Sequence, residues 1–117
     1  MALINKENQI YVDTFGNDQI SVYALIDHVE FSRKRSVLKF NVDLYVNKNA
    51  LDIGKFPFES HEFHVSGMDL KTILVEGKKT EIGMIYKRLY EWLVNKIQNN
   101  EVQKLNFLRS DEGGYDE

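Results

Sequence analysis

The sequence contains no cysteine, only one proline and no long hydrophobic run. Without cysteine, neither a disulfide framework nor a thiolate metal site can form. The first residues include no apolar stretch of signal-peptide length, and no segment resembles a membrane span. We therefore expect a soluble protein that is made in the cytoplasm and has no membrane partner.

The composition is that of one small globular domain. The chain has 117 residues, of which 43% are hydrophobic and 12% aromatic, so it can bury a core of its own. The formal net charge of −3 argues against a general nucleic-acid binder, because such proteins are usually basic.

Two long segments in the first half alternate between apolar and polar residues. In residues 37–47, five apolar residues occupy every second position, which predicts a strand with one buried face. Residues 19–31 also alternate, but the apolar positions change parity near Asp27 and His28, which predicts a bulge there. The polar turn at 32–36 joins the two segments, so we expect an antiparallel hairpin.

A third strand and a helix are expected after this hairpin. Residues 56–67 also change parity, which predicts a second bulge, and Pro57 favours an edge position or the start of a strand. Apolar residues from Ile82 to Ile97 recur at three- and four-residue spacing, which predicts a helix over 80–98 with Thr80 as its N-cap.

These elements predict an α+β domain with an antiparallel sheet of about four strands and one C-terminal helix packed on one face. We expect this single domain to span residues 1–100 and to begin with a short N-terminal arm. Residues 101–117 are acidic and rich in glycine near their end, which predicts a flexible tail.

The stretch "HEFHVSG" at 61–67 raises the question of a metal site. Successive side chains of a strand point to opposite faces, so His61 and His64 should diverge unless a bulge realigns them. The helical zinc motif needs H-E-x-x-H, whereas this stretch reads H-E-x-H. We predict no metal and no cofactor; an enzyme using His28, His61 and His64 with a divalent metal is the alternative.

No other pattern indicates catalysis. The serines lie in no G-x-S-x-G turn, and the segment "EGKK" at 76–79 lacks the pattern of a phosphate-binding loop. Sequence spacing singles out no pair of aspartates as a catalytic acid and base. We therefore predict a protein that is not an enzyme and has no small-molecule substrate.

The remaining candidates are assembly residues. A hairpin longer than the helix that covers it leaves apolar positions and strand edges for other subunits. Exposed aromatic residues on or beside the helix are anchors for a partner protein, and the basic hairpin tip is a further contact. The predicted interface comprises Arg33, Lys34, Arg35, Tyr45, Tyr90 and Trp92. A nucleic-acid site formed by Arg33, Lys34, Arg35, Lys78 and Lys79 is a less favoured interpretation.

The order of elements resembles that of small structural proteins encoded near the tail or baseplate genes of tailed bacteriophages. The matching segments are "VYALIDHV" (22–29), "LKFNVDLYVN" (38–47), "NAL" (49–51), "FPFESHEFHVSG" (56–67) and "IYKRLYEWL" (85–93). The resemblance covers about residues 20–97. The longer acidic tail and the absence of a proline near the end of the helix are departures from the pattern.

This resemblance implies a virion protein in the tail, baseplate or neck, synthesised in the host cytoplasm and without catalytic residues. Its expected partners are other virion proteins and copies of itself. The alternative is a small cytoplasmic protein-binding module or regulator, also without catalytic activity.

Overall fold

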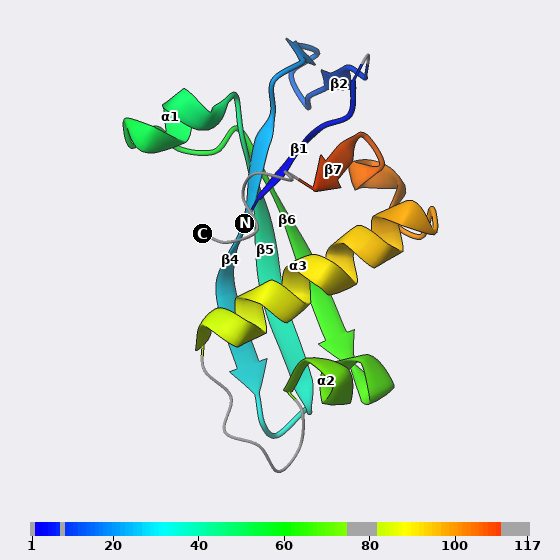
Figure 1. Ribbon diagram of the computed structural model, residues 1–117. Helices are drawn as coiled ribbons and strands as arrows, with labels where there is room; N and C mark the ends of the chain where they lie inside the picture. The colour runs from blue at the N-terminus through cyan, green and yellow to red at the C-terminus, as the bar shows by residue number, and fades with distance from the viewer. Residues whose placement is uncertain (1, 8, 75–81, 111–117) are drawn as a thin grey trace.

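The fold is built on an antiparallel five-stranded sheet with the order β6-β5-β4-β1-β7. The computed structural model describes residues 2–7, 9–74 and 82–110 (Figure 1). The strands are β1 (Leu3–Asn5), β4 (Tyr23–Ser32), β5 (Val37–Tyr45), β6 (Glu59–Ser66) and β7 (Leu108–Ser110). The predicted α+β class with an antiparallel sheet is confirmed.

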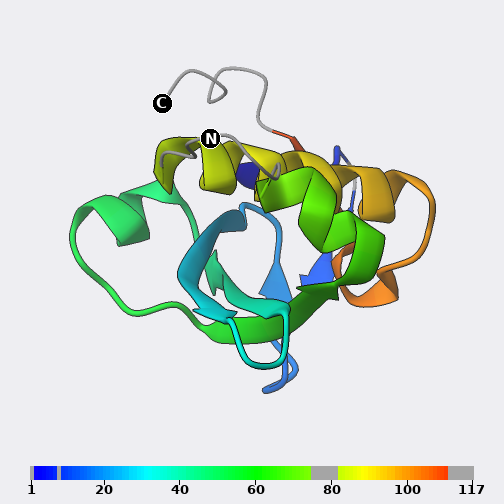
Figure 2. The same ribbon diagram turned by 90° about the horizontal axis from the view of Figure 1, so that it is seen from below.

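Two helices cover one face of this sheet. α3 (Ile82–Gln98) crosses the strands diagonally, and α2 (Gly67–Leu74) lies near the end of the sheet that carries the β4–β5 turn (Figure 1). The strands curl around these helices when seen from below (Figure 2). The remaining elements are α1 (Lys48–Asp52), the small hairpin of β2 (Tyr11–Val12) and β3 (Asp18–Gln19), and a 3₁₀ turn at Gln103–Leu105.

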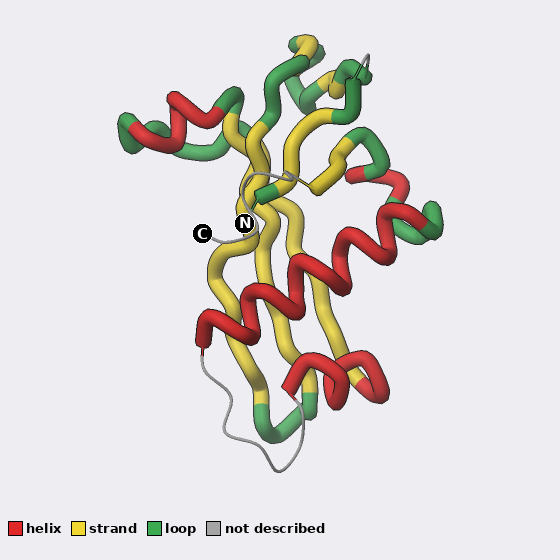
Figure 3. The backbone as a smooth tube through the Cα atoms, in the orientation of Figure 1, coloured by secondary structure: helices red, strands yellow, loops and turns green. Residues whose placement is uncertain are grey.

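The predicted element counts of about four strands and one helix were too low. β1 and β7 are three residues long, and α1 and α2 have five and eight residues, too short for a clear periodic pattern. Figure 3 shows how much of the molecule these short elements supply. Thr80, the predicted N-cap, and the "EGKK" segment lie outside the described residues.

The β4–β5 hairpin and its bulge are confirmed. Asp27 pairs with Asn41 and Glu30 with Lys39, so three steps along β4 match two steps along β5. His28 lies inside this bulge with φ +52°. The extra residue returns Val29 to the side of the sheet that packs against the core.

The second predicted bulge, inside 56–67, was wrong. β6 pairs with β5 without a register shift from Glu59 to Ser66. Phe56 and Pro57 precede the strand, so the change of parity falls where the strand begins. β6 is an edge strand, which agrees with the expectation from Pro57.

The core lies between β4, β5 and the two covering helices. The inward side chains of β5 are almost completely buried (Leu38, Phe40, Val42 and Leu44), and so are three residues one turn apart on α3 (Leu89, Leu93 and Ile97). The expectation that the hairpin leaves apolar positions unshielded therefore does not hold for these four residues of β5, whereas Phe31 of β4 and Val46, just after β5, are about half exposed. Toward the β4–β5 turn, α2 covers the sheet (Figure 1), and the Trp92 ring of α3 packs edge-on against Phe40.

Segments near both ends of the described part of the chain belong to the sheet more than the sequence suggested. β1 pairs with β4 and β7, so the predicted N-terminal arm contains a sheet strand. Leu105, Phe107 and Leu108 are buried, so the domain extends beyond residue 100 to at least residue 110. Residues 111–117 of the predicted tail lie outside the described residues. In the described part of the chain, no helix has the length and hydrophobicity needed to cross a membrane.

Candidate assembly surface

The basic cluster lies at the tip of the β4–β5 hairpin, as the sequence predicted. Arg33, Lys34 and Arg35 are all exposed in the turn between the two strands. The turn is closed by the Ser36 N–H, which donates to the Arg33 carbonyl at 3.4 Å. Lys78 and Lys79, the other cations of the nucleic-acid interpretation, lie outside the described residues.

The three predicted aromatic residues have different environments. Tyr90 is only 5% exposed, and its hydroxyl accepts a hydrogen bond from the Ile26 N–H at 2.8 Å. Burial raises the pKa of Tyr90 to about 12. Tyr90 is therefore a core residue rather than a surface anchor. Its hydroxyl accepts a hydrogen bond from a main-chain amide of β4 that points away from β5 and lies beyond the part of β4 that pairs with β1.

Trp92 and Tyr45 are partly buried. The Trp92 ring packs edge-on against Phe40, and its Nε1–H donates to Asp69 Oδ2 at 3.0 Å. Trp92 therefore joins α3 to α2. Tyr45 lies opposite Tyr23 in the ladder, and burial, followed by the nearby Asp43 and Asp27 carboxylates, raises the pKa of Tyr45.

The three histidines do not converge. His61 and His64 lie on opposite faces of the regular strand β6, and His28 is in the β4 bulge. Each histidine lies beside a carboxylate close to it in sequence (Asp27, Glu59 and Glu62). Among the residues that the structure describes, no three His, Asp or Glu side chains are grouped so as to hold a metal ion.

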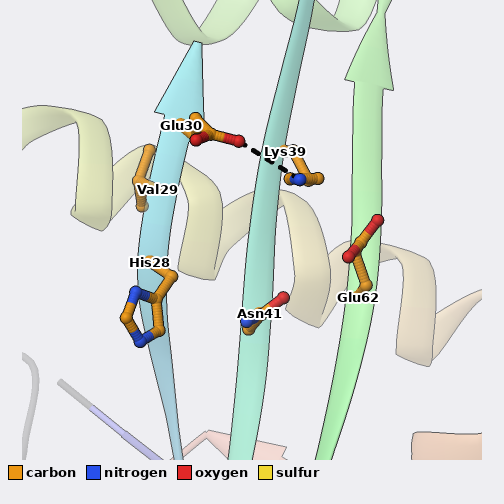
Figure 4. Close-up of a pocket in the computed structure, with 6 residues that line it drawn as sticks. All are labelled: His28, Val29, Glu30, Lys39, Asn41 and Glu62. Carbon is orange, nitrogen blue, oxygen red and sulfur yellow. Dashed lines mark ion pairs between the residues drawn. The ribbon is translucent and has the colours of Figure 1, made fainter.

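The face of the sheet away from the helices carries a shallow charged depression. It is lined by His28, Val29, Glu30, Lys39, Asn41 and Glu62 (Figure 4). Lys39 Nζ lies 3.1 Å from Glu30 Oε2, and the hydrogen bond and charge of Glu30 raise the pKa of Lys39. This ion pair crosses from β4 to β5 within the depression.

Exposed apolar side chains gather at the other end of the sheet, away from the β4–β5 turn. The β2–β3 hairpin and α1 both project there (Figure 1). The exposed residues are Ile10, Val12, Phe15 and Ile20 on and beside the hairpin, and Val46, Ile53 and Phe56 around α1. We call these seven residues the apolar end. Phe15 is 83% and Phe56 94% exposed, whereas aromatic side chains usually contribute to a core or an interface.

Glu59 holds the β2–β3 hairpin against the start of β6. Its carboxylate, with only 9% of the side chain exposed, accepts hydrogen bonds from Thr14 N–H at 2.8 Å, Thr14 Oγ1 at 2.6 Å and the Tyr11 hydroxyl. His61 Nε2 lies 3.2 Å from the same carboxylate. Burial opposes ionisation of Glu59, but the hydrogen bonds from Thr14 and Tyr11 outweigh it, so the pKa of Glu59 is lowered.

The turn that carries Phe15 is ordered by Asp13. Asp13 Oδ1 accepts from the Phe15 and Asn17 amides, both at 2.9 Å, and Oδ2 accepts from Gln19 Nε2 at 3.1 Å. The hydrogen bond from the Asn17 amide is the main reason that the pKa of Asp13 is lowered. Phe15 is thus presented on a fixed turn, which reduces the entropy cost of binding a partner.

The α1 part of the apolar end includes a small notch. Asn47 caps α1 by accepting from the Ala50 N–H at 2.8 Å, and Gly54, at φ +81°, reverses the chain after the helix. The notch holds about 150 Å³ and is lined by Val46, Asn47, Asn49, Ala50, Ile53, Lys55 and Phe56. A second shallow hollow extends from Ile20 to Lys48, so the hairpin base and α1 border one surface.

Comparisons with known proteins do not identify a family. No protein-family model, no curated protein and no solved structure matches this chain.

Two features of the sequence are partial signals of the apolar end. Phe56 lies beside Pro57 and out of phase with the apolar residues of β6, and Phe15 precedes the turn glycine Gly16. An apolar residue in a turn is a common position for a contact residue. Only the fold, however, shows that these two segments lie at the same end of the molecule.

Proposed function

We propose that this protein is a non-catalytic structural subunit in the virion of a tailed bacteriophage, in the tail, baseplate or neck. It binds other virion proteins through the apolar end. The observation that carries the assembly role is the pair of nearly fully exposed phenylalanines, Phe15 and Phe56, on two fixed loops at one end of the sheet. The assignment to a phage virion rests on the resemblance in the order of elements across residues 20–97.

The magnitude of the apolar end favours a binding role. At about 25 cal/mol per Å² of apolar surface, burying an exposed phenylalanine side chain such as Phe15 or Phe56 contributes roughly 1.5 to 3 kcal/mol. Ordering one side chain at an interface costs only about 0.5 to 1.5 kcal/mol. Exposed apolar residues grouped in this way mark protein-interaction surfaces more often than those scattered singly.

Quantitative mass spectrometry of density-purified virions tests the proposal. The phage that encodes the chain is grown, and the ratio of this chain to the major tail protein is measured in virions and in the infected-cell lysate. We expect the chain in virions at a fixed ratio that survives high-salt washing, since an apolar contact is not screened by salt. A chain that is abundant in the lysate but absent from virions contradicts the proposal and supports the cytoplasmic regulator.

A further inference from the structure

The sheet has three unpaired strand margins in the described residues, and they differ in how they are protected. β7 is a margin of only three residues. The unpaired part of β4 contains the His28 bulge, and its Ile26 amide is bonded to Tyr90. β6 is eight residues long, pairs regularly on its inner side and includes no proline, lysine or bulge. Short strands, bulges, prolines and lysines are among the devices that prevent edge pairing. β6 has none of these four, although it carries Glu59 and Glu62, so it is the margin with the fewest such devices.

The direction of the β6 main-chain groups follows from β4. The Ile26 N–H donates to Tyr90 and not to β5. Successive residues of an antiparallel strand direct their main-chain groups to alternate sides, so those of Val42, the partner of Ile26, point toward β6. His61, the partner of Val42, therefore points toward β5. The main-chain groups of the alternate residues face the free edge: Ser60, Glu62, His64 and Ser66.

This alternation of main-chain directions along β6 limits how a second β6 can pair across a two-fold axis. Hydrogen bonds form only where edge-facing residues of both copies lie opposite each other. Two such registers overlap the strands most fully, with the axis at residue 62 or at residue 63. The first places Glu62 opposite Glu62 of the second copy, which brings two carboxylates together. The second places Glu62 opposite His64 of the second copy, and His64 opposite Glu62.

The monomer already shows that these two side chains are complementary. His64 Nε2 lies 2.8 Å from Glu62 Oε1, and both side chains are more than half exposed on the face away from the helices. In the second register each Glu62 carboxylate would lie beside His64 of its own copy and His64 of the second copy. Phe63, which stacks on Phe40 at 5.6 Å, would meet its own symmetry mate at the axis.

We propose that β6 pairs with β6 of a second copy of this chain, antiparallel and with the two-fold axis at Phe63, which joins two five-stranded sheets into one. This inference goes beyond the proposed function because it uses a surface different from the apolar end. Either surface can fail its test without the other. A strand from a different protein on this edge, in place of a second copy, is an outcome that the measurements distinguish.

A charge series at exposed positions tests the register. Sedimentation velocity should show a monomer–dimer equilibrium for the natural chain. His64→Glu places carboxylates opposite each other at both symmetric positions and should weaken dimerisation by about tenfold or more. The double variant Glu62→Lys/His64→Glu restores opposite charges and should recover the dimer. A natural chain that stays monomeric at about 1 mM, or a single variant that dimerises as well as the natural chain, overturns the proposal.

Cysteine cross-linking measures the same register independently, because the natural chain has no cysteine. At the axis, the two residues at position 63 form a non-hydrogen-bonded pair with Cα atoms about 4.5 Å apart, within the range of a disulfide. Phe63→Cys should form a covalent dimer on mild oxidation. The matched Ser60→Cys variant should not, because its two positions are about 20 Å apart in this register. Cross-linking through Ser60→Cys and not Phe63→Cys overturns the proposal, and if Phe63→Cys does not fold, the charge series alone decides.

Discussion

Removing the charge of Glu59 should destabilise the molecule and release the hairpin that carries Phe15. Glu59→Gln keeps the shape of the side chain but replaces one acceptor oxygen with an amide donor. The carboxylate now accepts from Thr14 N–H, Thr14 Oγ1 and the Tyr11 hydroxyl, so the introduced amide would face a donor. Hydrogen bonds to a charged group contribute about 1.5 to 3 kcal/mol each.

The expected loss is smaller than the sum of these bonds. Thr14 is exposed, so water can replace part of what it loses, and the amide oxygen keeps one acceptor. We expect a loss of about 2 to 3 kcal/mol in the free energy of unfolding, which lowers Tm by about 8 to 12 °C at roughly 4 °C per kcal/mol for a chain of this size. The assays are chemical denaturation and differential scanning calorimetry at pH 7.

The pH dependence of this loss provides the sharper test. The pKa of Glu59 is lowered from its ordinary value of 4.5, so ionised Glu59 stabilises the folded state above pH 4.5, and this contribution disappears as the pH falls through the folded pKa. The stability difference between the natural chain and Glu59→Gln should therefore shrink on acidification. A difference that is the same at pH 7 and at pH 3 would show that the charge of Glu59 does not stabilise the folded state. Glu30→Gln, which removes an exposed carboxylate that forms an ion pair with Lys39, should cost less than about 1 kcal/mol at pH 7.

Three further changes test other parts of the fold. Tyr90→Phe leaves the buried Ile26 amide without its acceptor and should cost about 1 to 3 kcal/mol in urea denaturation; a cost near zero would contradict the role assigned to the hydroxyl. Asn47→Ala removes the α1 cap and should speed amide hydrogen exchange in α1 alone, with a stability loss of about 1 kcal/mol. Leu105→Ala leaves a cavity in the core and should cost about 2 to 5 kcal/mol, whereas it would not change the stability if residues from 101 onward formed a flexible tail.

The elements that could be predicted from sequence are those with a long repeated pattern. The β4–β5 hairpin was predictable because its alternation continues over nearly ten residues on each strand, and the bulge because the apolar parity changes at Asp27. The main helix was predictable for the same reason, with Leu89, Leu93 and Ile97 repeating on one face.

The elements that were missed depend on tertiary contacts. β1 and β7 pair with each other over three residues, too few to show a period. Tyr90 follows Leu89 on the helix and was expected at the surface, but the unpaired Ile26 amide of β4 bonds to its hydroxyl inside the core. This requirement arises only because β1 pairs with β4 no further than Ala24.

The apolar end was missed for a different reason. Apolar residues in short segments are normally assigned to a core, since composition alone does not reveal which side of an element they occupy. Phe15 and Phe56 are both exposed. Asp13 and Glu59 order the loop of Phe15, and the Lys55 amide donates to the Ala50 carbonyl just before Phe56. The two loops are far apart in the sequence, so their position at the same end of the molecule is seen only in the fold.

An incorporation assay decides whether the protein enters a virion through its apolar end, as we propose. A phage lacking the gene is complemented with the natural chain, with Phe15→Ser/Phe56→Ser, or with Phe31→Ser, which changes an exposed phenylalanine near the opposite end of the sheet. We predict that the natural chain and Phe31→Ser are recovered in purified virions, and that the double variant folds normally but is lost from them. Equal incorporation of the folded double variant would contradict the account.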